Sequence, residues 1–137
     1  MIYLILTLVA AALLVCVRLA YRIEAKRLPT KQARFTDREN LNVEEIYQRY
    51  FSDSGLRKEK VIDLWIKIAQ TLHLEPGRLR PTDRFDAELA PVQGHLVEDE
   101  LIDLEELARD QFQDRWQKIK ATKPCDLNEF IHMLLHE

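Results

Sequence analysis

Residues 61–72, VIDLWIKIAQTL, form the most regular stretch of the chain and indicate its fold class. Apolar residues recur there at the spacing of one helix face, and neighbours widen the stripe: Val61, Leu64, Trp65, Ile68, Ala69 and Leu72, with Ile62 and Ile66. Intervals of three and four predict an amphipathic helix, which must bury its apolar face against other elements. The stretch therefore predicts a helix of a packed helical body, ending before Pro76-Gly77.

Two further helices are predicted by their start signals. Asn42 with Glu45 makes a capping-box pattern for a helix that ends near Phe51. Asp126 with Glu129 makes a second capping box. The core face of the helix after Asp126 comprises Leu127, Phe130, Ile131, Leu134 and Leu135. The intervening Ser52-Asp53-Ser54-Gly55 predicts a turn. We expect an all-α domain over residues 42–137, a small bundle.

Between these helices the sequence predicts a long loop and an acidic helix. The loop runs from about residue 73 to 97, and Phe85 and Leu89 are expected to pin it to the core. The acidic helix is expected from about Glu98 to Trp116. Its apolar face comprises Leu101, Leu104, Leu107, Ala108 and Phe112. Carboxylates in its first turns suit the positive end of the helix dipole.

Composition and charge exclude several classes of protein. The chain has 137 residues and a formal net charge of −3, and its acidic residues concentrate after residue 39. An acidic body repels phosphates, so nucleic-acid binding is not expected. Only three glycines occur, too few for a glycine-rich phosphate loop. The two cysteines, Cys16 and Cys125, give no disulfide framework and suit a reducing compartment.

The first residues predict a membrane anchor. Residues 1–17 are an apolar run with one Thr, interrupted by Arg18 and extended to Tyr21. A bilayer core needs roughly 20 apolar residues, and Arg18 can extend its charge to the interface. We expect residues 1–28 to form a transmembrane and juxtamembrane helix that stops at Pro29. Residues 29–41 are then a basic linker, either solvated or lying on anionic lipid.

The flanks of the apolar run predict its orientation. A cleaved signal peptide needs a basic region before the apolar core and small residues at the cleavage site. Nothing basic precedes Ile2, and Val17-Arg18-Leu19 is a poor cleavage site. Seven Lys and Arg residues follow the run, between Arg18 and Arg38. The positive-inside rule then predicts a single-pass protein with its N-terminus outside and its C-terminal domain cytoplasmic, in a bacterial inner membrane.

Residues 58–136 resemble acyl and peptidyl carrier proteins. The shared order is a long amphipathic helix, a long proline-containing loop, an acidic helix and a short last helix. Phe85 and Glu88-Leu89 match the loop of the carriers. Asp99, Leu101, Leu104 and Glu105 match their acidic helix. The resemblance implies a carrier-like four-helix bundle whose acidic helix docks Arg and Lys of partner proteins.

The chain departs from the carrier pattern at the attachment site. Carriers bear a phosphopantetheine arm on the serine of an aspartate-serine-leucine motif, and here Glu100 replaces that serine. A carboxylate cannot accept the arm, and Ser52 and Ser54 lie in a turn, not after a long loop. Nine residues separate Leu89 from Asp99, more than in typical carriers. We therefore expect no phosphopantetheine and no other cofactor.

Other candidate sites are weaker. His132 and His136 lie four apart and could bind a metal, but a solvated pair at a helix C-terminus is the more common arrangement. Asp99 and Asp103 could form a cation or acid–base site, yet their pattern favours an acidic surface. Neither serine lies in a nucleophile elbow. We expect neither a metal site nor enzyme activity.

These observations predict a membrane-tethered, non-enzymatic, carrier-like adaptor. Its partner would be a protein with a basic surface, docked on the acidic helix through Glu98, Asp99, Glu100, Asp103, Glu106 and Asp110. An alternative is a small membrane protein of envelope biology or defence, an immunity or assembly factor whose carrier-like shape is incidental. In that case the long loop or the anchor would bind the partner.

Overall fold

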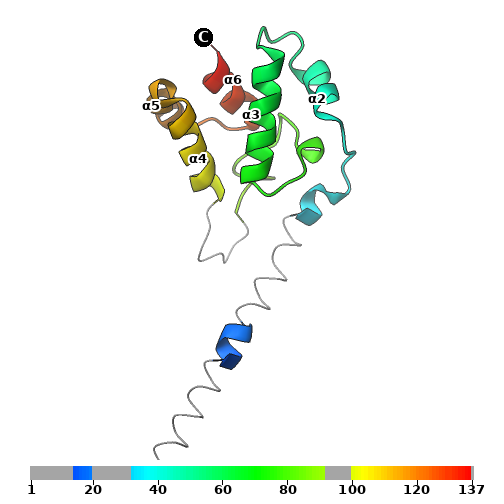
Figure 1. Ribbon diagram of the computed structural model, residues 1–137, viewed down its shortest axis with the longest axis vertical. Helices are drawn as coiled ribbons and strands as arrows, with labels where there is room; N and C mark the ends of the chain where they lie inside the picture. The colour runs from blue at the N-terminus through cyan, green and yellow to red at the C-terminus, as the bar shows by residue number, and fades with distance from the viewer. Residues whose placement is uncertain (1–13, 20–31, 92–99, 137) are drawn as a thin grey trace, which may run out of the picture. The chain divides into compact units, whose positions relative to one another are not determined.

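The computed structural model describes residues 14–19, 32–91 and 100–136 (Figure 1). The chain divides into two compact units, Met1–Arg34 and Phe35–Glu137. The second unit contains α2 (Val43–Tyr50), α3 (Lys58–Thr71), the 3-10 turn η1 (Pro76–Arg78), α4 (Glu100–Gln111), α5 (Gln113–Thr122) and α6 (Leu127–Leu135). Within the described ranges there is no strand, only one isolated bridge between Arg84 and Asp126. The prediction of an all-α protein is confirmed.

Helix α3 is the centre of the second unit. It contacts α2, α4, α6 and η1 (Figure 1). Its apolar stripe, from Val61 to Ala69, is buried. The Trp65 side chain is 1% exposed, and its indole N–H donates to the Pro76 carbonyl at 2.9 Å. The ring of Phe51 packs edge-on against that indole. The stretch from Val61 to Leu72 therefore organises the core, with its polar indole atom satisfied.

The predicted helix starts are found with one difference. Asn42 caps α2, and Glu45 accepts the Asn42 N–H, which confirms the first capping box. Asp126 caps α6 by accepting the Glu129 N–H at 2.9 Å. The Glu129 carboxylate, however, accepts from Cys125 rather than from Asp126. The Asp126 backbone lies opposite Arg84 in the isolated bridge, which fixes the chain before α6.

Helix α3 ends in a Schellman motif with an unusual residue. The N–H of Leu74 donates to Ala69 at 2.9 Å, and that of His73 donates to Gln70 at 3.1 Å. His73 has φ 52°, in the left-handed region. Glycine is the preferred residue at this position because it lacks the Cβ that makes the conformation costly.

We therefore expect His73→Gly to stabilise the second unit by about 1 kcal/mol, since a left-handed conformation costs L-residues roughly that amount. His73 is exposed, so the change removes no packing. Chemical unfolding of the full chain measures the shift, with His73→Ala as the matched control. Equal stability of the two variants would contradict a cost from the backbone conformation.

The acidic helix does not run to Trp116 as predicted. It ends at Gln111, and α5 begins at Gln113, which corrects the predicted boundary. Between them Phe112 has φ −135° and ψ 48°, outside the helical region. Its N–H donates to Ala108, and its carbonyl accepts from Arg115 and Trp116. One residue thus closes α4 and opens α5, and its ring packs against the core.

The second unit includes part of the predicted linker. Phe35 and Leu41 are 1% and 5% exposed, buried in the same core as α3. Arg78 donates to the carbonyls of Phe35 and Thr36, the last residues of a helical segment. Arginine at a helix C-terminus satisfies carbonyls that lack partners within the helix. Residues 35–41 and 76–83, which we call the clasp, hold one another in place.

An ion pair and a backbone contact complete the clasp. The Arg38 guanidinium donates to both Asp83 oxygens, at 2.6 and 2.9 Å, and the Asp83 side chain is 2% exposed. The N–H of Leu41 donates to Gly77 at 3.0 Å. Burial raises the pKa of Asp83, and this rise is opposed by the Arg80 N–H and by Arg38. Asp83 is the only buried charged side chain among the described residues, so its partners matter for stability.

The first unit is described at residues 14–19 and 32–34, and both segments are helical. Four of their apolar side chains are exposed by half or more: Leu14, Val15, Val17 and Leu19. Among the residues that the structure describes, no helix is long and apolar enough to cross a membrane. The rest of the predicted anchor, residues 1–13 and 20–28, lies outside the described residues.

Candidate docking surface

Helix α4 presents two different faces. Leu104 and Ala108 are buried in the core, 2% and 0% exposed. Asp103, Glu106 and Asp110, spaced by three and four positions, are exposed along another face. Residues at this spacing are neighbours on a helix surface, so the three carboxylates form one stripe. We call this stripe the α4 acidic surface.

The acidic surface is only weakly neutralised by its own helix. Arg109 lies 3.5 Å from Glu106 and 3.6 Å from Asp110. All three side chains are more than half exposed, and ion pairs of this kind contribute about 0–1 kcal/mol. Asp103 has no ion pair with any described residue. The carboxylates can therefore exchange these contacts for those of a partner at little cost.

An apolar side chain accompanies the charges. Ile102 is 54% exposed and precedes Asp103 on α4. Docking surfaces gain most of their binding energy from a few desolvated anchors, while charges guide and orient the encounter. Ile102 and the acidic surface together offer both kinds of contact. Sequence reasoning missed this residue, because it lies outside the predicted apolar face of the helix and carries no charge.

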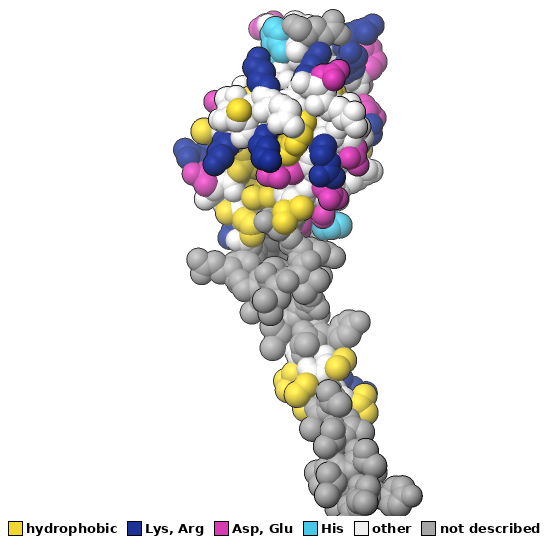
Figure 2. All heavy atoms as spheres, turned by 90° about the vertical axis from the view of Figure 1, so that its left-hand side faces the viewer, with side chains coloured by type: hydrophobic (Ala, Val, Ile, Leu, Met, Phe, Trp, Pro, Cys, Tyr) yellow, Lys and Arg dark blue, Asp and Glu magenta, His cyan; other side chains and the backbone are white. Residues whose placement is uncertain are grey.

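The next helix has the opposite charge. Arg115, Lys118 and Lys120 lie on α5, against one carboxylate, Asp114. Figure 2 faces the side of the unit where α4 and α5 lie, and it shows Lys and Arg side chains beside acidic and hydrophobic ones. The acidic stripe of α4 therefore borders a helix whose charged side chains are mostly basic. A partner that docks there must match a narrow stripe rather than a broadly acidic face.

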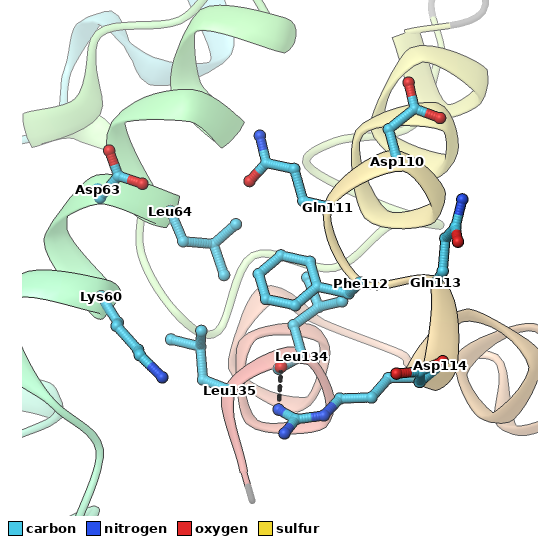
Figure 3. Close-up of a pocket in the computed structure, with 11 residues that line it drawn as sticks. Lys60, Asp63, Leu64, Asp110, Gln111, Phe112, Gln113, Asp114, Leu134 and Leu135 are labelled. Atoms are coloured by element: carbon cyan, nitrogen blue, oxygen red, sulfur yellow. Dashed lines mark hydrogen bonds between the residues drawn. The ribbon is translucent and has the colours of Figure 1, made fainter.

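A cleft adjoins the C-terminal end of the acidic surface (Figure 3). It has a volume of about 600 Å³ and lies between α3, the corner at Phe112, and α6. Phe112, Leu64 and Leu134 meet at its base, while Asp63 and Asp110 lie at opposite rims (Figure 3). The Arg115 guanidinium donates to the Leu134 carbonyl and links α5 to α6.

The structure places the predicted partner-binding residues as follows. Asp103, Glu106 and Asp110 lie together on the acidic surface, and Glu100 is half-buried at the start of α4. Glu98 and Asp99 lie outside the described residues. The predicted pairing of Asp99 with Asp103 therefore also falls outside what the structure describes. Half of the predicted set is therefore brought together as exposed neighbours.

The weaker candidates show structural contacts. His132 packs against the Phe51 ring and lies 6.1 Å from the His136 ring, centroid to centroid. Within the described ranges no group of three His, Cys, Asp or Glu side chains could hold a metal ion. The Ser54 hydroxyl donates to Phe51 and accepts from Leu56, as a turn residue does. The predicted turn is confirmed.

Comparison of the chain with protein-family models, with curated proteins and with solved structures finds no match.

Proposed function

We propose that this chain is a membrane-tethered, non-enzymatic adaptor that docks the basic surface of a partner protein on α4. The observation that carries the proposal is the α4 acidic surface: three exposed carboxylates in one stripe, with the exposed Ile102 on the same helix. Such a stripe attracts Lys and Arg over a distance of about 10 Å at moderate salt, which accelerates and orients association.

The carrier resemblance gives the proposal its context. In carrier proteins the helix equivalent to α4 is the one that partner enzymes dock. Glu100 takes the place of the serine that bears the arm, so the proposed role keeps the docking surface without the carried group. A chain of this kind would occupy or regulate a docking site, or serve as a scaffold.

The proposed tether is the apolar N-terminal run. Its described part, residues 14–19, exposes Leu14 and Val15 by 66% and 57%. Transfer of such side chains out of water is favourable, by roughly 25 cal/mol for each Å² of apolar surface that is buried. Residues 35–41 pack into the folded unit through the clasp.

Charge reversal tests the docking role. Asp103→Lys, Glu106→Lys and Asp110→Lys, combined in the full chain in bilayer nanodiscs, should lower the affinity for a captured partner on the order of a hundredfold, as expected when three ion pairs become repulsions. Because all three residues are exposed, thermal unfolding should change little. Binding is measured by biolayer interferometry against the purified partner at two salt concentrations.

The matched control reverses exposed carboxylates on other elements, Asp53 and Glu59. The control variant should bind as the unmodified chain does, because neither residue belongs to α4. An equal loss of affinity in both variants, or no loss in the α4 variant, would remove the acidic surface from the proposal.

A further inference from the structure

Helices α4 and α5 carry opposite charges on one side of the folded unit. Helix α4 holds five carboxylates and one arginine, a formal charge of −4. Helix α5 holds three basic side chains and one carboxylate, a formal charge of +2, and Lys123 follows at its C-cap. The corner at Phe112 joins the two helices, and both lie on the side that Figure 2 faces. This side of the chain therefore offers an acidic and a basic surface next to each other.

The lysines of α5 are exposed and have no counter-charge in the described part of the chain. Lys118 and Lys120 lie at the two edges of the outward face of α5, with the exposed Gln117 and Ala121 between them. Lys123, also exposed, follows at the end of the helix. None of the three lysines has an ion pair with a described residue. We call these three lysines the α5 basic surface.

The two surfaces complement each other between copies of the chain. The ion pairs of the α4 acidic surface stay within α4, so the lysines of α5 do not neutralise it within one chain. In a two-fold dimer every contact occurs twice, because a residue that meets a second residue of the other copy is itself repeated there. If α4 of each copy lies on α5 of the other, three carboxylates face three lysines on both sides of the axis. A face that holds both members of a complementary pair can therefore pair with itself.

We propose that two copies of this chain form a two-fold dimer in which the α4 acidic surface of each copy docks on the α5 basic surface of the other. The exposed Ile102 and Ala121 lie among these charges and lose contact with water when the helices meet. The inference rests on the proposed function, since it takes the α4 acidic surface as a docking surface, and it adds a regulation of that surface. While the dimer lasts the surface is covered, so a different basic protein must displace the second copy.

Sedimentation velocity of the full chain in a neutral detergent measures this dimer. Its dissociation constant should rise between about 50 mM and about 500 mM salt, because exposed charges are screened. Two variants reverse one surface each. The α4 variant carries Asp103→Lys, Glu106→Lys and Asp110→Lys, and the α5 variant carries Lys118→Glu, Lys120→Glu and Lys123→Glu. Each variant alone should weaken the dimer on the order of a hundredfold, because attractions on both sides of the axis become repulsions.

Mixing the two variants should restore the dimer. The α4 variant has two basic surfaces and the α5 variant two acidic ones, so neither pairs with itself, while both contacts of a mixed dimer are attractive. A chain that carries all six substitutions should also dimerise as the unmodified chain does, and its net charge is the same. Asp53→Lys with Glu59→Lys, exposed and outside α4 and α5, is the matched control and should leave the dimer unchanged.

The proposal is overturned if the unmodified chain sediments as a monomer throughout a concentration series, if the dimer survives both reversals, or if the mixture of the two variants stays monomeric. None of these results bears on the docking role, which fails only if the α4 variant still binds a different captured protein. The α5 variant keeps the acidic surface without a second copy on it, so it should bind that protein at least as tightly as the unmodified chain does. Weaker binding by the α5 variant would overturn the proposed regulation.

Discussion

Arg38→Ala is expected to destabilise the folded unit by about 3 kcal/mol, because it leaves the Asp83 carboxylate buried without its counter-charge. The Asp83 side chain is 2% exposed, so water solvates its charge poorly in the folded unit. Arg38 is itself 27% exposed, which places the effect at the lower end of the range for buried ion pairs. Chemical unfolding, followed by tryptophan fluorescence of the full chain, measures the loss.

The pH dependence of this variant identifies its cause. A carboxyl whose folded-state pKa is raised binds its proton more tightly in the folded protein, so stability falls as pH rises through that pKa. Burial raises the pKa of Asp83, and removing Arg38 should raise it further. The loss of stability caused by Arg38→Ala should therefore be largest at neutral pH, and it should shrink as pH falls through the raised pKa of Asp83.

Arg49→Ala is the matched control, since the Arg49–Glu39 pair is exposed and its atoms lie 4.0 Å apart. It should cost less than about 0.5 kcal/mol at any pH. A deficit of Arg38→Ala that grows on acidification, or that equals the control, would show that the ion pair does not stabilise the clasp.

Gly77→Ala should destabilise the folded unit by about 3 kcal/mol, the upper end of the usual cost of overpacking. Gly77 is buried, and a Cβ there would overlap the Leu41 carbonyl oxygen and the Asn40 side chain. The side chain can move away, but the backbone carbonyl can do so only if residues 40–41 separate from η1. The Leu41 N–H, which donates to Gly77 at 3.0 Å, should then exchange faster with deuterium.

Gly55→Ala provides a contrast by a different mechanism. Gly55 has φ +73° and nothing near the added Cβ, so its cost comes only from the left-handed backbone, about 1 kcal/mol. Exchange at Leu41 should stay as in the unmodified chain. If Gly77→Ala unfolds at the same denaturant concentration as the unmodified chain, the result would contradict the close contact between η1 and Leu41.

Local signals in the sequence were sufficient for most helices. The stripe from Val61 to Leu72 and the caps at Asn42 and Asp126 act within a few residues, so their spacing alone predicts α3, α2 and α6. The exposed carboxylates on α4 were predicted for the same reason. A helix fixes which positions are neighbours, and Asp103, Glu106 and Asp110 follow that period.

The features that were missed depend on distant partners. Arg78 and Arg80 donate to backbone carbonyls about 40 positions away. Because every residue has a backbone carbonyl, no pattern of residue types marks the acceptors of the clasp. Phe35 and Leu41, two apolar residues in a polar stretch, were the only signal in the sequence. The corner at Phe112 has neither Gly nor Pro, and the apolar period continues across it to Trp116.

Zero-length carbodiimide cross-linking tests the docking role most directly, because it joins a carboxylate to a lysine only where the two groups are in contact. The full chain in native membranes is treated, purified with its partner and analysed by mass spectrometry. The docking role predicts cross-links from Asp103, Glu106 or Asp110 to lysines of one partner protein. A partner linked only through carboxylates of other elements, such as Glu44 or Glu59, would contradict it.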